Sequence, residues 1–365
     1  MNHNEETRNG LTLIEVLVVF SILALLASLM LPGVRNARSA ARRAQCLNNM
    51  RNVGTAMQTY ATVNHGRLPP LTTSELSLGQ GLGSRPVSWP ILIHPYTECC
   101  SLFEEIQSVD TQTEANRLAS RSIDSWTCPD DPLEEASGRL SFVVNAGFIS
   151  ESRWGEVDNT SHAVDAYDYP FDGTGTITAA DQDVTFATGV FWRADPSTPP
   201  TLRITLSDIS LADGTSQTLL LSENFDTRPF DSVTQTGGWS SSATGDLAFG
   251  IPVTEAGHPS IVADSTIEGG IGVAGTADQP FPSTALVLSP PTLRTAQGSI
   301  NASLGKATPG AAPRPSSLHP LMVNAIMCDG SGRALSKAIA PGVYRRLVTH
   351  NGMKFGQDKL RSTDY

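Results

Sequence analysis

A single carboxylate, Glu15, lies inside the most apolar stretch of the chain. From Leu11 to Leu31 the sequence runs for 21 residues without another charge. A helix of that length spans roughly 30 Å, the thickness of the hydrocarbon core of a bilayer. A charged residue at the centre of such a helix costs about 2.5–3.5 kcal/mol, so we expect Glu15 to meet a cationic partner.

The residues around Glu15 resemble a known processing site. Gly10-Leu11-Thr12-Leu13-Ile14-Glu15-Val16-Leu17 is similar to the cleavage and methylation site of type IV prepilins and type II secretion pseudopilins, although Leu11 replaces the usual Phe. The resemblance implies that a prepilin peptidase cuts between Gly10 and Leu11, that Leu11 is N-methylated, and that Glu15 meets the terminal amine of a neighbouring pilin-like subunit. Such a pair neutralises itself in a low-dielectric bundle. The alternative is a plain signal anchor with an incidental glutamate.

Near the C-terminus, His319 and Asp329-Gly330 are a second candidate for chemistry. Asp-Gly between the apolar runs 321–328 and 333–335 predicts a β-hairpin, which gives Asp329 a sufficient structural role. His319 lies about ten residues earlier and faces either Asp329 or another site. A hydrogen-bonding histidine is the simpler interpretation, and a ligand or catalyst is the alternative.

The cysteines and one acidic segment offer two further kinds of site. No CxxC or His-flanked pair occurs, so local spacing does not indicate zinc, and no metal site is assigned. In an exported body up to two disulfides could form, with the pairing left open. An acidic segment invites a calcium site of irregular geometry, but Pro170 occupies a would-be ligand position, and an acidic surface loop is the simpler interpretation. The disulfide candidates are Cys46, Cys99, Cys100, Cys128 and Cys328, and the calcium candidates are Asp168, Asp172, Asp181 and Asp183.

Enzymatic activity and nucleic-acid binding are not expected. No nucleophile elbow, phosphate loop, HExxH or dinucleotide motif is present. Residues 1–65 carry six Arg and three Glu, and the remainder holds 19 Lys and Arg against 33 Asp and Glu. A body with a net charge of −14 does not suit contact with a phosphate backbone.

The candidate site residues lie on two kinds of structure that the sequence predicts, a long helical stem and a turn-rich body. We divide the chain into a leader at 1–10, a transmembrane helix at 11–32, an amphipathic helix at 33–65 and an exported β-rich body at 66–365, with an insertion at 150–200 and a loop-rich part at 227–315. Apolar residues recur every three or four positions in the second segment and predict packing against the chain's own sheet. The stripe comprises Val34, Ala37, Ala41, Ala44, Leu47, Met50, Val53, Met57 and Tyr60. The expected fold is α+β and pilin-like, a long helix on a mainly antiparallel sheet.

Several short segments are assigned within the body. We predict helices at 102–106, 114–123 and 341–348, and strands at 140–148, 184–192, 201–206 and 218–222. The order of Cys46-Leu47-Asn48-Asn49, Cys128-Pro129-Asp130-Asp131-Pro132 and His319 with Asp329-Gly330 resembles exported, prepilin-headed proteins with domain of unknown function 1559. That resemblance covers nearly the whole chain and implies architecture more than activity.

The predicted function is a membrane-anchored pilin-like or pseudopilin-like subunit of a type IV pilus or type II secretion-like system. It would cross the inner membrane once, with the body outside the cytoplasm or at the cell surface. The Arg residues that follow the apolar run, taken alone, would place that side in the cytoplasm, which conflicts with this topology. The alternative is an anchored binding module for a polysaccharide, another solute or calcium, with stacking residues drawn from Trp154, Tyr167, Trp192 and Trp239.

Overall fold

The fold is given by a computed structural model. It describes residues 12–73, 87–98, 100–119, 121, 123–131, 140–150, 186–192, 203–224, 247–253, 300, 315–319, 321–355 and 360.

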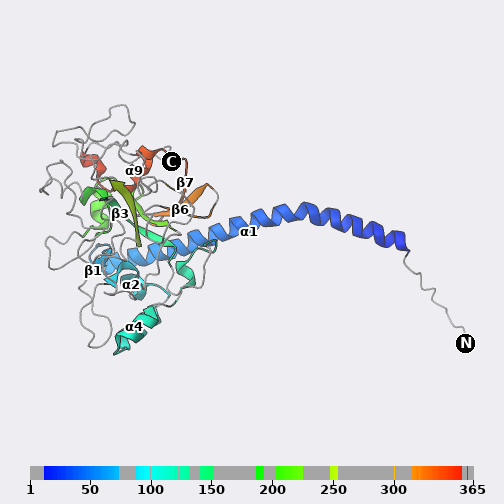
Figure 1. Cartoon of the computed structure of the whole chain (residues 1–365). Helices are drawn as coiled ribbons and strands as arrows, with labels where there is room; N and C mark the ends of the chain where they lie inside the picture. The colour runs from blue at the N-terminus through cyan, green and yellow to red at the C-terminus, as the bar shows by residue number, and fades with distance from the viewer. Residues whose placement is uncertain are drawn as a thin grey trace, which may run out of the picture.

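Helix α1, Leu13–Val63, is the longest element and continues through Pro32 with the gentle curve seen in Figure 1. It begins at a capping box, in which the Thr12 side chain accepts from the Glu15 amide and the Glu15 side chain accepts from the Thr12 amide. It ends where His65 and Gly66 take left-handed backbone angles, with φ of 57° and 82°.

A five-stranded sheet forms the centre of the body, in the order β5-β3-β4-β6-β7. All neighbours pair antiparallel except β3 and β5, which are parallel. The predicted mainly antiparallel sheet is thus confirmed. The strands are β3 at Phe142–Ser150, β4 at Leu219–Glu223, β5 at Ala248–Val253, β6 at Met322–Met327 and β7 at Gly332–Ser336.

Two helices cover opposite faces of this sheet. Ile326 on β6 packs in the same apolar cluster as Met50 and Met57 of α1. Its neighbours Ala325 and Met327 face the other way, into a cluster with residues of α9, Pro341–Val348. This alternation follows from the pleat of the strand. The body is therefore a layered structure with α1 below and α9 above the sheet in Figure 1.

Shorter elements complete the described part of the body. A two-stranded ribbon and several single-turn or two-turn helices lie around the central sheet. They are β1 at Thr72–Thr73, β2 at Val87–Ser88, α2 at Trp89–Ile93, η1 at His94–Tyr96, α3 at Cys100–Ser108, α4 at Gln112–Ala119, η2 at Asp124–Trp126, α6 at Leu206–Leu211 and η6 at Gly352–Phe355.

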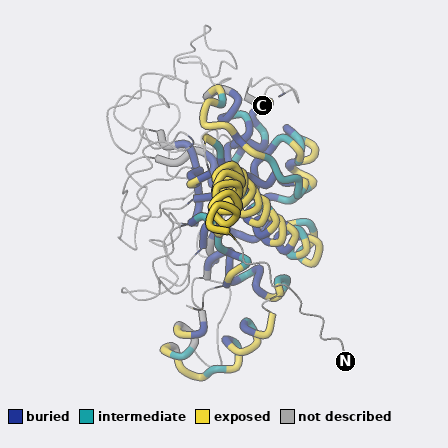
Figure 2. Tube along the Cα trace, turned by 90° about the vertical axis from the view of Figure 1, so that its right-hand side faces the viewer, coloured by how far each residue is buried: buried dark blue, intermediate teal, exposed yellow. Residues whose placement is uncertain are grey.

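The amphipathic stripe is only partly correct. Met50, Val53 and Met57 are fully buried as predicted. Burial of α1 begins at Cys46, however, and Val34 is 52% exposed, because the body does not extend along the first part of the helix. Figure 2, which looks along α1, shows this exposed part in front of the buried body.

Two predicted strands are wrong. Residues 186–188 form a helical turn, after which the amides of Val190 and Phe191 both donate to the Asn145 carbonyl instead of forming a ladder. Of the segment 201–206 the structure describes residues 203–206, in which Thr205 forms only an isolated antiparallel bridge with Arg67. Helix α6 begins at Leu206, after a capping box between Thr205 and Asp208. The strands predicted at 140–148 and 218–222, the helices predicted at 102–106 and 341–348, and the hairpin of β6 and β7 are present. The helix predicted at 114–123 is present in part, because α4 spans Gln112–Ala119 and the described residues 121 and 123 lie outside it.

Candidate functional site

The first candidate site is the free part of α1. From Leu13 to Leu31 nearly every position is a large apolar residue or a small one, and all are exposed. Within the part of the chain that the structure describes, this is the one helix long and apolar enough to cross a membrane. A helix that is apolar on every side is stable in lipid or in a bundle of similar helices, not in water.

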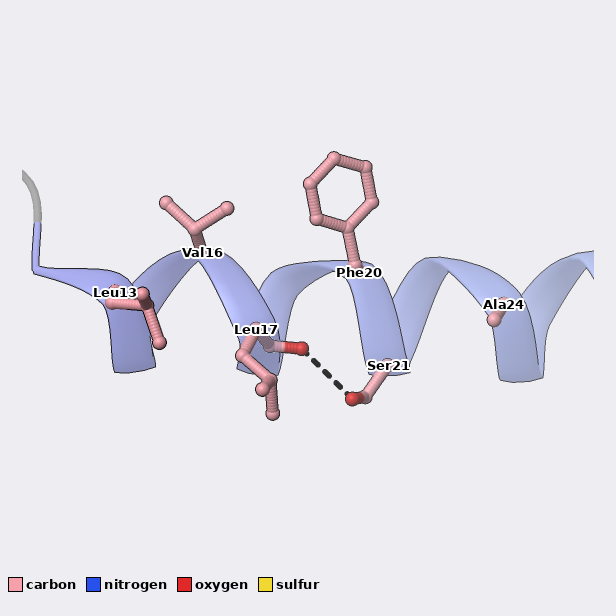
Figure 3. A pocket seen from close by; sticks show the side chains of 6 residues that line it. All are labelled: Leu13, Val16, Leu17, Phe20, Ser21 and Ala24. Atoms are coloured by element: carbon pink, nitrogen blue, oxygen red, sulfur yellow. Dashed lines mark hydrogen bonds between the residues drawn. The ribbon is translucent and has the colours of Figure 1, made fainter.

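Polar groups in this segment are satisfied inside the helix. Ser21 Oγ donates to the Leu17 carbonyl at 2.8 Å, and Ser28 Oγ donates to the Leu25 carbonyl at 2.7 Å. Figure 3 shows the first of these bonds on an open, shallow surface that is otherwise apolar. It is lined by Leu13, Val16, Leu17, Phe20, Ser21 and Ala24.

Glu15 is held at the start of the helix by Thr12. Its Oε2 accepts from the Thr12 amide and from the Thr12 hydroxyl, each at 2.8 Å. Among the described residues, no group donates to Oε1. The carboxylate is therefore oriented by its own helix and keeps one oxygen for another donor.

The second candidate site is a buried polar cluster inside the body. Cys46 Sγ donates to Glu223 Oε1 at 2.5 Å, and His319 Nε2 lies 3.2 Å from the same oxygen. Cys128 Sγ lies 3.5 Å from His319 Nε2 and 3.8 Å from Glu223 Oε1. Four side chains with metal-ligating atoms thus lie within 4.8 Å of one another.

Each member of the cluster comes from a different element. Cys46 lies on α1 where the helix first meets the body, and Cys128 follows η2 in a turn. Glu223 ends β4, and His319 lies shortly before β6. The sheet fixes β4 beside β6, and α1 crosses these strands, so the fold itself brings the four together.

Further polar residues orient the cluster. The backbone N–H of Asn324 donates to Glu223 Oε2 at 2.8 Å, and the side-chain Nδ2 of Asn324 donates to Glu223 Oε1 at 2.9 Å. On the other side of the imidazole, His319 Nδ1 lies 3.1 Å from Asp130 Oδ2, an ion-pair distance without hydrogen-bond alignment. Asp130 also pairs with Arg42 of α1.

The cluster perturbs the pKa of each member. A hydrogen bond from Cys46 lowers the pKa of Cys128 to about 7, while the same contact raises the pKa of Cys46. Burial opposes protonation of His319, but its contacts with Cys128 and Glu223 raise its pKa to about 10. Burial likewise opposes ionisation of Glu223, yet His319 lowers its pKa overall. The cluster therefore favours an ionised Cys128 and Glu223 beside a protonated His319. Perturbed pKa values of this kind are common at functional sites.

Other sequence-predicted residues lie apart from this cluster. Asp329 accepts from the Ser331 amide at 2.8 Å in the turn between β6 and β7, where Gly330 has a φ of 83°. Their role is the hairpin, as predicted, and His319 faces Glu223 and Cys128. Cys328 is a buried thiol whose pKa is raised by burial, and Cys100 is an exposed thiol. The structure gives no disulfide among Cys46, Cys100, Cys128 and Cys328, so the disulfide prediction stays a prediction.

Several predicted residues lie outside the described part of the chain. These are Gly10, Leu11, Cys99 and the calcium candidates Asp168, Asp172, Asp181 and Asp183. Of the proposed stacking residues only Trp192 is described, and it is 2% exposed, so it does not offer a stacking face.

Sequence reasoning missed Glu223, Asp130 and Asn324. Glu223 lies 177 residues from Cys46, so no local spacing could reveal the contact. The available signal was that Cys46, Cys128 and His319 all belong to the segments that carried the family resemblance.

Comparison with known proteins covers almost the whole chain. The family described as "Protein of unknown function (DUF1559)" matches residues 35–342. The "Prokaryotic N-terminal methylation motif" matches residues 7–31. No curated protein and no solved structure matches. The motif implies processing by a prepilin peptidase and suggests a membrane-anchored protein with an exported body.

Proposed function

Because the chain belongs to the DUF1559 family and begins with a prokaryotic N-terminal methylation motif, we propose that it is a pilin-like or pseudopilin-like subunit. It is released from its leader between Gly10 and Leu11 and joins other pilin-like subunits through α1. The assembly is a type IV pilus or a type II secretion-like filament. The role is structural and not enzymatic.

The observation that carries this proposal is the free part of α1. Its side chains from Leu13 to Leu31 are exposed, apolar on all sides and continuous with the part that packs on the body. A free apolar surface of this extent requires lipid or other helices. One uninterrupted helix also fixes the direction in which the body projects from such a bundle.

Glu15 supplies register within the assembly. Thr12 holds one carboxylate oxygen, and the other is left for the N-terminal amine of a neighbour. In lipid an unpaired carboxylate is costly, so pairing favours the one stagger that brings an amine to Glu15. Residues elsewhere on the helix contribute packing without selecting a stagger.

The test is co-expression of the full chain with a prepilin peptidase in a bacterial membrane. Intact-mass measurement should find a chain that begins at N-methyl Leu11, and Gly10→Val should leave the leader in place. With two reporter thiols per stem, from Leu17→Cys and Leu23→Cys, oxidative crosslinking should give ladders of stems, because a single thiol could join only one neighbour.

Glu15→Ala should be processed normally but lose the ladder, because its neighbour's amine has no partner. Glu104→Ala, which removes an exposed charge from α3, is the matched control and should retain it. A chain that still begins at Met1 beside an active peptidase would refute processing, and an intact ladder in Glu15→Ala would refute the role of Glu15.

A further inference from the structure

We propose that Cys46, Cys128, Glu223 and His319 bind one zinc ion, which fastens the stem helix α1 to the body. All four side chains are buried and come from four separate segments. The proposal concerns the body and is independent of whether the stems assemble.

The separations between donor atoms match tetrahedral zinc. With Zn–S near 2.3 Å and Zn–N or Zn–O near 2.0 Å, neighbouring donors lie roughly 3.3–3.8 Å apart. Nε2 of His319 lies 3.2 Å from Glu223 Oε1 and 3.5 Å from Cys128 Sγ, and that sulfur lies 3.8 Å from the same oxygen. Cys46 Sγ, 2.5 Å from Oε1, must move outward by about 1 Å, which a thiolate and carboxylate on one cation would do by mutual repulsion.

The charge of the cluster also suits a divalent cation, which would displace the proton that the Cys46 thiol donates to Glu223. Two cysteine side chains and a carboxylate share a buried space, and ionisation of both thiols would leave three negative charges against one imidazole. Buried charges need to be paired or to coordinate a metal. A divalent cation would neutralise two of the three, and the inward position of His319 Nε2 would allow it to bind that cation.

The surrounding residues have the arrangement expected around a metal site. Asp130 lies behind Nδ1 of His319 at 3.1 Å, the place of the carboxylate that orients a ligating imidazole, and a small rotation of the ring would align a hydrogen bond between them. Asn324 fixes both oxygens of Glu223. Arg42, which pairs with Asp130, adds a positive charge beside a site whose four ligands would carry a net charge of −1 with zinc bound.

The donor set selects zinc over calcium or magnesium. Two sulfurs and one imidazole are soft or borderline ligands, whereas calcium and magnesium take oxygen. Four protein donors complete a tetrahedron and leave no position for water, which is the arrangement of structural zinc sites. Because the ligands come together only in the folded chain, binding would stabilise the fold.

A disulfide between Cys46 and Cys128 is the competing use of these thiols in an oxidising compartment. It would give Glu223 and His319 no role. Each alternative excludes the other, because a disulfide sulfur is no longer a thiolate ligand. The thiols of the isolated protein therefore decide between them.

The experiment uses the full chain in detergent, purified without chelator or reductant. Elemental analysis should find one zinc per chain, and replacement with Co²⁺ should give the intense visible absorption of a tetrahedral cobalt–thiolate site. Cys128→Ser and His319→Ala should lose the ion, and the conservative Asp130→Asn should weaken zinc binding about 10–100-fold while the chain remains folded.

Cys328→Ser is the matched control, since it removes a buried thiol outside the cluster and should keep one zinc. Circular dichroism identifies variants that fold. The proposal is overturned if peptide mapping finds a Cys46–Cys128 disulfide, if the reduced folded chain binds no zinc, or if Asp130→Asn and Cys128→Ser bind it as tightly as the native chain.

Discussion

The two halves of α1 have the same backbone conformation and opposite surroundings. From Leu13 to Leu31 the side chains are exposed and apolar on every side, whereas from Cys46 to Ala61 one face is buried against the sheet and the other is polar. The first half therefore needs partners from outside the chain, and the second half has them within it. A single helix can carry both because helix formation depends on the backbone, while the side chains determine the environment.

The change occurs over a short polar stretch rather than at a break in the helix. Pro32 and Gly33 lie at the end of the apolar half, and Arg35, Arg38, Arg42 and Arg43 follow before burial begins at Cys46. In the proposed zinc site the first buried residue is also the first ligand. The proposed zinc ion would therefore fasten α1 to the body at the point where the helix enters it.

The largest predicted effect comes from shortening one apolar side chain in each half of α1 and comparing the two free energies of unfolding. Met57 is fully buried, and Met57→Ala should lower the free energy of unfolding of the body by about 2–5 kcal/mol, since a cavity remains. Urea unfolding of the full chain in detergent, followed by tryptophan fluorescence, measures it. Leu23→Ala, at a position 54% exposed, should change that free energy by less than about 0.5 kcal/mol. Comparable losses in both variants would contradict the division.

Lowering the pH should destabilise the body but not the exposed half of α1. Among the described residues, only the body contains buried histidines. Burial lowers the pKa of both His94 and His350 to about 4, from a usual value near 6.5. Between those values the unfolded chain binds protons that the folded body does not, so stability falls as pH falls. From pH 7 to pH 5, His94 and His350 should each cost about 2 kcal/mol. Buried His319, whose pKa is raised to about 10, acts in the opposite direction over this range.

His350→Asn isolates one share of this pH dependence. Nδ1 of His350 lies 2.8 Å from the Gly189 carbonyl, and an asparagine amide can donate in its place without titrating. Unfolding free energies at pH 7 and pH 5 should differ by about 2 kcal/mol less in this variant. If the free energy of unfolding changed equally with pH in the variant and the native chain, His350 would not be kept neutral by the fold. The exposed half of α1 should remain helical at both pH values.

Local sequence signals predicted the elements but not the cluster. The apolar run, the Asp329-Gly330 turn and the apolar segment that became β4 each act over a few residues, and the structure has them where they were predicted. The strand predicted at 201–206 is reduced in its described residues to one bridge between Thr205 and Arg67, because the capping box of Thr205 and Asp208 starts α6 at the next residue. Glu223 meets Cys46 only after the sheet and α1 have packed, so its role depends on contacts that no short segment encodes.

The smallest predicted effect compares two glycines on the same helix. A Cβ at Gly54 would lie 3.1 Å from Ile326 Cγ2, whereas a Cβ at Gly33 would have nothing within 4 Å. Alanine favours a helix over glycine by about 1 kcal/mol at either position, but overpacking at Gly54 costs about 1–3 kcal/mol. Gly54→Ala should therefore destabilise the body by roughly 1 kcal/mol, while Gly33→Ala should leave its unfolding unchanged. If Gly54→Ala instead raised the unfolding free energy, the contact between α1 and β6 would be looser than 3.1 Å implies, and the buried half would resemble the exposed one.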